Sequence, residues 1–125
     1  MLKEGISLTL EKVVNENETA AKIASGALNV FATPILIAFM ENTSFELIQK
    51  ELPAGETTVG ISVDIKHLKA NLVGDKIKCI SVLEKIDGKK LDFSVKVYHG
   101  DTLVGEGKHG RFIINEEKFL NKLKG

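Results

Sequence analysis

Residues 35–52 read ILIAFMENTSFELIQKEL, and this segment limits the possible folds more than any other part of the chain. Its composition is typical of a helix, and the Pro53 and Gly55 that follow predict where the helix ends. The first half is apolar on every side, so it cannot rest on a surface with one face in water. We therefore predict a helix that the rest of the chain encloses.

Thr33 and Pro34 predict the start of this helix, because threonine is a favoured N-cap and proline is tolerated at the first helical position. The pair Thr43 and Glu46 resembles a capping box and leaves open a second helix that would begin there. One long helix is the preferred interpretation, since no glycine or proline interrupts the segment.

The remaining chain shows the two-residue period of β-strands, with apolar and polar side chains in alternation. We predict one strand before the helix, near residues 6–11, and four after it, at about 58–66, 75–86, 91–97 and 102–114. A change of apolar parity near Cys79 and Ile80 indicates a bulge. Turns are expected at residues 87–88 and 99–101, and a short amphipathic helix should follow Asn115. This order predicts a single α+β domain, residues 1–125, with an antiparallel sheet.

Charge and composition exclude several classes of function. The chain has 17 Lys+Arg and 17 Asp+Glu residues, whereas a nucleic-acid or anionic-membrane partner normally requires a basic excess. No apolar run reaches the ~20 residues of a membrane span, and the N-terminus lacks the apolar region of a signal peptide. The single Cys79 excludes an internal disulfide and a multi-cysteine metal site. We expect a soluble, cytoplasmic protein without a nucleic-acid partner, a membrane partner or a metal.

Three residues could carry chemistry. His67 ends the alternating run and shares odd-numbered parity with its apolar members, so it should lie at the rim of the core, where an imidazole suits general-base catalysis. Glu41 ends the apolar half of the helix, and burial in a cleft would raise the pKa of its carboxyl and suit it to nucleophilic or acid–base work. Thr33 stands beside the free N–H groups of a helix N-terminus, which favour a developing oxyanion.

Each of these residues also has a purely structural interpretation. His67 could be a core-edge histidine, Glu41 could mark the place where the helix emerges into water, and Thr33 could be only a cap. Thr33 and Glu41 are eight residues apart, which separates them by roughly 12 Å along a helix axis. They could therefore border one elongated site without touching.

The late segment around residue 110 gives weaker signals. Residues 105–110 match G-x-G-x-x-G, but the strand pattern continues through them, so a dinucleotide-binding turn is not expected. Arg111 is the only arginine beside sixteen lysines, and its planar guanidinium could bind phosphate or carboxylate in a way that lysine cannot. His109 on the same strand face is either a neighbour of the site or a structural residue.

Four segments resemble the fluoroacetyl-CoA thioesterase group of hotdog proteins. They are VFATPILIAFME (30–41), GETTVGISVDIKHL (55–68), DGKKLDFSVKVY (87–98) and GEGKHGRFIIN (105–115), in the order that the family shows. The resemblance implies a hotdog fold, in which a curved antiparallel sheet of about five strands wraps a long central helix. It also implies homodimers joined through their sheets, with the sites at the subunit interface.

The same resemblance implies roles for five residues. Thr33, Glu41 and His67 match the family's catalytic residues, Gly60 matches a glycine whose backbone lies against the acyl group, and Arg111 matches an arginine near the site. The fluoroacetyl-specific enzyme has aromatic residues in a lid before VFAT, whereas residues 20–29 here read AAKIASGALN. This departure favours an ordinary small or medium acyl-CoA as the substrate.

The sequence therefore predicts an enzyme, an acyl-CoA thioesterase that needs no metal and no cofactor beyond the coenzyme A of its substrate. In this hypothesis His67 is the general base or the acid for the leaving thiolate, and Glu41 is the nucleophile or orients water. The Thr33 hydroxyl and the Gly60 N–H would support the carbonyl oxygen. The alternative is a non-catalytic acyl-CoA-binding or regulatory module on the same fold.

Overall fold

Helix α1 spans Thr33–Gln49 as one uninterrupted element in the computed structural model, which describes residues 1–125. The predicted single helix is confirmed, and no second helix begins at Thr43. The Thr43 and Ser44 hydroxyls instead donate to the carbonyls of Phe39 and Met40, one turn earlier. The predicted cap is wrong, because Ala32 holds the N-cap position and Thr33 is already the first helical residue.

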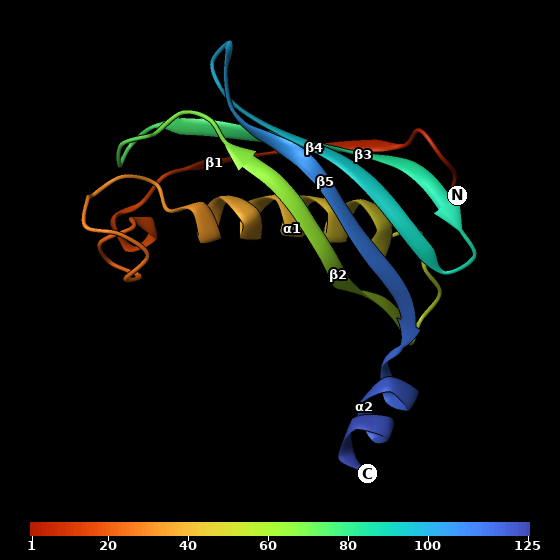
Figure 1. Ribbon diagram of the computed structural model, residues 1–125. Helices are drawn as coiled ribbons and strands as arrows, with labels where there is room; N and C mark the ends of the chain where they lie inside the picture. Colours follow the sequence, from red (N-terminus) through yellow and green to blue (C-terminus); the bar gives the residue numbers. More distant parts are fainter.

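Five strands form one antiparallel sheet that arches over α1 (Figure 1). They are β1 (Ser7–Val13), β2 (Glu56–His67), β3 (Lys76–Asp87), β4 (Lys90–His99) and β5 (Thr102–Asn115). Their order across the sheet is β1-β3-β4-β5-β2, and every neighbouring pair is antiparallel. The α+β architecture with a sheet curved around the helix is therefore as predicted, and β1 and β2 are the two edge strands. The prediction that the chain encloses the helix on every side is wrong, because Pro34, Ala38 and Asn42 are exposed on the side away from the sheet.

The connecting segments also follow the sequence signals. Gly88 and Gly100 take positive φ values of 62° and 61° in the β3–β4 and β4–β5 turns, a backbone region that glycine enters without steric cost. The short 3-10 helix η1 (Glu16–Glu18) precedes a series of turns over residues 20–29, which we call the 20–29 loop. At the C-terminus α2 (Glu116–Lys124) is capped by the Asn115 side chain and extends away from the sheet (Figure 1).

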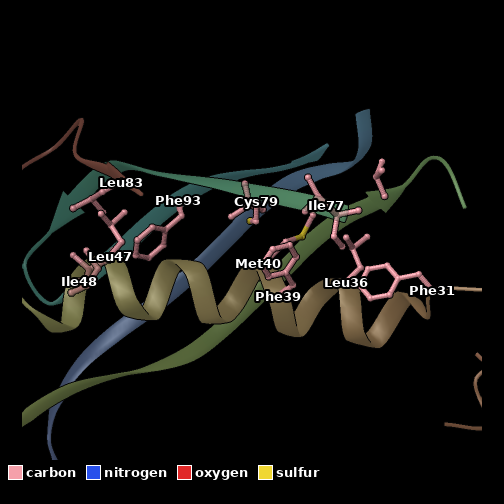
Figure 2. Close-up of a cluster of buried hydrophobic side chains, with 14 of the residues drawn as sticks. Phe31, Leu36, Phe39, Met40, Leu47, Ile48, Ile77, Cys79, Leu83 and Phe93 are labelled. Atoms are coloured by element: carbon pink, nitrogen blue, oxygen red, sulfur yellow. The ribbon is translucent and has the colours of Figure 1, made fainter. Parts of the chain in front are cut away.

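The core lies between α1 and the concave face of the sheet. Figure 2 shows side chains of α1, from Leu36 to Ile48, pointing toward the side chains of β3 and β4. Gly105 of β5 allows the helix to approach, since a Cβ there would lie 2.9 Å from Leu36 Cδ2. Leu36 is fully buried, so its truncation to alanine should cost about 2–5 kcal/mol of stability. None of the helices is long and apolar enough to cross a membrane.

Two irregularities in the strands differ from the sequence pattern. The bulge in β3 lies between Leu83 and Lys85, not near Cys79, so Cys79 keeps its place in the buried row of the strand. A second register shift, between Gly60 and Ser62 of β2, was not predicted. It puts the odd-numbered residues before and after it on opposite faces, so Val59 does not share the concave face with His67.

Candidate active site

Thr33 and His67 form the first part of the candidate site. The first residue of α1 meets the last residue of β2, and Thr33 Oγ1 lies 2.8 Å from His67 Nδ1. The aromatic ring of Phe31 stands edge-on to the imidazole, with the two ring centroids 6.4 Å apart. The hydroxyl that the sequence suggested as a helix cap is thus a hydrogen-bond partner of the histidine.

The other ring nitrogen of His67, Nε2, is buried and has no hydrogen-bond partner. Buried polar atoms in proteins are nearly always paired, so this nitrogen distinguishes His67 from an ordinary hydrogen-bonded core histidine. Burial lowers the pKa of His67 from its ordinary value, and the backbone of Lys69 opposes this shift in part. The imidazole is therefore neutral at pH 7.

An open cavity of about 310 Å³ lies against this pair. Its walls are the start of α1, the residues that follow β2, and the 20–29 loop with its flanking residues. Ala20, Ser25 and Val30 contribute from the loop side, and Phe31 is the only aromatic residue that lines the cavity. The cavity places small and aliphatic side chains next to the reactive pair.

Glu41, Gly60 and Arg111 form a second part, two turns further along α1. Glu41 Oε2 lies 3.9 Å from Arg111 Nη1, and the carboxylate side chain is 40% exposed while the guanidinium side chain is 8% exposed. A Cβ at residue 60 would lie 2.7 Å from Glu41 Oε2, closer than real Cβ contacts occur. Gly60 is thus the residue that allows the carboxylate to lie against the β2 backbone.

Arg111 is fixed by its neighbours on the concave face. Its Nε donates to Thr58 Oγ1 at 2.7 Å and its Nη2 donates to the Thr58 carbonyl at 3.0 Å. The guanidinium carbon also lies 5.7 Å from the centre of the Phe45 ring, within the range of a cation–π contact. Thr58 was not predicted, because only the three-dimensional pairing of β2 with β5 brings it to Arg111.

The five predicted residues therefore fall into two groups within one chain. The Thr33–His67 pair and the Glu41–Gly60–Arg111 group share the concave side of β2 and α1, and no hydrogen bond or ion pair joins them. The helical rise between Thr33 and Glu41 is about 12 Å, as expected from their spacing. Within a single chain the two groups face the same side but do not meet.

A model of the fluoroacetyl-CoA-specific thioesterase family matches residues 14–117. The chain belongs to this family. Its membership places it among the thioester hydrolases, in agreement with the function that the sequence predicted. A fluoroacetyl-CoA thioesterase of Streptantibioticus cattleyicolor is 28% identical over 95 residues, which are 76% of this chain and 68% of the relative.

Solved structures of a fluoroacetyl-CoA thioesterase agree with the family assignment. One matches with a TM-score of 0.93 and 25% identity, covering 99% of this chain and 96% of the other. A variant of that enzyme in complex with fluoroacetate and CoA matches with a TM-score of 0.89 and 26% identity, covering 94% and 99% of the two chains. The predicted hotdog fold is confirmed by this likeness.

Proposed function

We propose that this member of the family hydrolyses the thioester of a small or medium acyl-CoA at a centre that contains Thr33, Glu41 and His67. The observation that carries the proposal is the Thr33–His67 hydrogen bond in the wall of a cavity, which leaves the second ring nitrogen of His67, Nε2, without a partner. Water adds to the thioester carbonyl, the carbon–sulfur bond breaks, and the coenzyme A thiolate takes a proton. The products are the free acid and the thiol.

The tautomer of His67 decides which proton transfer it performs. If Nδ1 carries the proton and donates to Thr33, Nε2 has a free electron pair and acts as the general base for water. If Thr33 donates to Nδ1, Nε2 carries the proton and can give it to the leaving thiolate. Both forms are neutral imidazoles, consistent with the lowered pKa. In the first form one turnover can use the ring twice: Nε2 takes a proton from water, which makes the ring an imidazolium, and then gives that proton to the leaving thiolate.

Glu41 and Gly60 have complementary roles at the acyl group. The Glu41 carboxylate is the nucleophile, in which case water hydrolyses the acyl-enzyme that it forms, or it orients the attacking water. Arg111 Nη1 lies 3.9 Å from its Oε2. The Gly60 N–H and the Thr33 hydroxyl are the donors that support the carbonyl oxygen as negative charge develops on it. No step requires a metal ion in this scheme.

We infer that the two groups become one site in a homodimer. Strand β2 is an edge of the sheet, with Ile61 50% exposed and Val63 42% exposed, and exposed apolar edges pair with other chains unless they are protected. An antiparallel pairing of two β2 strands about Val63 and Asp64 would set His67 opposite Gly60 of the partner subunit. Glu41 of the partner subunit would then approach the Thr33–His67 pair.

The cavity supports a substrate larger than a fluoroacetyl group alone. Its volume is about 310 Å³, at the lower end of the range for small-molecule sites, and the 20–29 loop contributes no aromatic side chain to it. An aliphatic acyl chain of a few carbons suits such a wall.

The direct test is a thiol-release assay of the purified protein against acyl-CoAs from acetyl to decanoyl, with phenylacetyl-CoA included. Release of free coenzyme A with an optimum among the short or medium chains is the expected result. Saturable acyl-CoA binding with no thiol release across the whole panel would refute hydrolysis and indicate a non-catalytic binding module.

A further inference from the structure

His109 lies in the middle of β5, on the concave face, and is only 2% exposed. It pairs with Val63 of β2 on one side and with Phe93 of β4 on the other. Its ring stacks on the Phe93 ring, with centroids 5.9 Å apart and an interplanar angle of 29°. A buried imidazole at this place could be only a core residue. Its hydrogen bonds show whether it also fixes the position of a neighbouring polar side chain.

Both ring nitrogens of His109 have specific partners. Nδ1 lies 2.8 Å from the Ser62 carbonyl oxygen, which can only accept, so Nδ1 carries the proton. Nε2 lies 3.2 Å from Arg111 Nη1, which can only donate, so Nε2 provides a free electron pair. The two contacts together select one neutral tautomer of the imidazole.

The charged groups around His109 agree with this neutral state. Burial lowers the pKa of His109, the Ser62 backbone contact opposes the shift, Arg111 adds to it and Glu41 opposes it. A proton on Nε2 would remove the acceptor for Arg111 and place a second positive charge beside the guanidinium. The imidazole therefore acts as a hydrogen-bond acceptor for Arg111 at neutral pH.

The Arg111 nitrogen that lies nearest the proposed site is Nη1, and its hydrogen-bond partner is His109. Thr58 holds Nε and Nη2, and His109 is the only side chain within hydrogen-bond distance of Nη1. Nη1 is also the atom nearest to Glu41, at 3.9 Å, too far for a hydrogen bond. One N–H of Nη1 is thus directed to His109, and the other remains free for the carboxylate or for a bound ligand.

The Ser62 carbonyl connects His109 to the bulge in β2. The register of β2 shifts between Gly60 and Ser62, so the carbonyl that accepts the hydrogen bond from His109 Nδ1 belongs to the irregular part of the strand. The same irregular part carries Gly60, where a Cβ would lie 3.4 Å from His109 Cε1 and 3.5 Å from Arg111 Nη1. His109 therefore contacts the backbone near Gly60 and the guanidinium near Glu41 at once.

We propose that His109 is a positioning residue that fixes Arg111 Nη1 relative to Glu41 and Gly60 through its Nε2 acceptor, with its own ring held by the Ser62 carbonyl. It does not touch the reacting atoms and acts through Arg111. The effect of this positioning on turnover rests on the proposed function of Glu41 and Gly60. The positioning itself is a property of the folded protein that can be measured without turnover.

Two substitutions distinguish the effect of the His109 Nε2 acceptor from the effect of its stacked ring. His109→Gln can keep an acceptor for Arg111 and a donor for Ser62, whereas His109→Phe keeps a stacking ring and removes both hydrogen bonds. We expect His109→Phe to lower kcat at least about tenfold with a smaller change in KM, since a displacement of a supporting group by about 1 Å has effects of this size. His109→Gln should recover kcat to within about threefold of the wild type. His99→Gln, at the exposed end of β4, is the matched control and should leave kcat unchanged.

A double variant shows whether His109 acts through Arg111. In an Arg111→Met background the change His109→Phe should cause no further loss of kcat, because the residue that it positions is absent. Losses that multiply would mean that His109 contributes independently and would overturn the proposal. Unfolding free energies of all variants, measured in urea, show whether a loss of activity is only a loss of folded protein.

The decisive readout is nuclear magnetic resonance of the wild type and the two His109 variants, labelled with ¹⁵N. The wild-type imidazole should be the neutral tautomer with its proton on Nδ1, and the Arg111 Nε signal should be sharp, shifted in His109→Phe and restored in His109→Gln. A proton on Nε2 in the wild type, or an Arg111 signal that is identical in all three proteins, would overturn the proposal. Absence of thiol release by the wild type would instead refute the proposed function and leave these signals interpretable.

Discussion

The two groups of site residues are held in opposite ways. Arg111 is buried and bonded through all three guanidinium nitrogens, to Thr58 and to His109. His67 lines an open cavity, shares one hydrogen bond with Thr33 and has no partner for its Nε2. A group that carries a fixed charge gains from complete hydrogen bonding, whereas a group that transfers protons needs a free atom. In the proposed mechanism this difference corresponds to electrostatic support from the sheet and proton transfer at the junction of β2 and α1.

The largest expected effect comes from removal of the free imidazole. His67→Ala should lower kcat by about 10²–10⁴-fold, the usual contribution of a positioned acid or base. Affinity for a non-hydrolysable acyl-CoA analogue should change by less than about threefold, because the lost interaction belongs to the transition state. Steady-state kinetics and calorimetric titration measure the two quantities. Near-normal turnover would remove His67 from the mechanism.

A smaller loss of kcat is expected when a methyl group is added at Gly60, beside the Glu41 carboxylate. In Gly60→Ala the new Cβ would lie 2.7 Å from Glu41 Oε2, so the carboxylate must move away from the β2 backbone. We expect kcat to fall by about 10–100-fold, as for displaced catalytic groups in general. Gly125→Ala, where a Cβ meets no neighbouring atom, is the control. Full activity of Gly60→Ala would show that the position of Glu41 is unimportant.

Thr33→Val removes the hydroxyl and keeps the shape of the side chain. One charge-neutral hydrogen bond contributes about 0.5–1.5 kcal/mol, so kcat/KM should fall by about 2–12-fold. Thr33→Ser keeps the hydroxyl and should stay within about twofold of the wild type. A loss in Thr33→Ser together with full activity in Thr33→Val would indicate that the methyl group, and not the bond to His67, is what matters.

The smallest of the expected effects is the change of kcat/KM with pH near neutrality. Burial lowers the pKa of His67, so the base is neutral above pH 6.5 and becomes protonated only as the pH falls below that value. Activity should be nearly constant from pH 8 to about 6.5 and then decline, with its midpoint below the ordinary histidine pKa of about 6.5. A midpoint above 6.5 would contradict the assignment of the free nitrogen as the base.

The sequence predicted the long helix and the succession of strands along the chain, because apolar periodicity and turn residues act locally, and its family resemblance implied the hotdog fold. It did not predict that β2 pairs with β5 at the edge of the sheet. It did not predict the register shift at Gly60, since a single extra residue leaves no clear mark in an alternating run. That shift separates Val59 from the face of His67. It also provides the carbonyl for His109, whose role therefore could not be assigned from spacing.

Thr33 and Thr58 also make contacts that the local sequence did not predict. The local signal at Thr33 and Pro34 is that of a helix cap, but the hydroxyl pairs with a histidine 34 residues away. Thr58 carried no signal at all, because its partner Arg111 is 53 residues away and reaches it only across the β2–β5 pairing. Local patterns predict elements, whereas these contacts depend on tertiary structure.

Subunit mixing tests most directly whether the two groups form one site across a dimer. His67→Ala and Glu41→Gln are each expected to be nearly inactive alone, and the two proteins are mixed, exchanged and assayed for thiol release. If each site takes His67 from one subunit and Glu41 from its partner, half of the dimers gain one intact site, and activity should return to about a quarter of the wild-type value. A mixture that stays as inactive as its components after verified exchange would contradict the shared site.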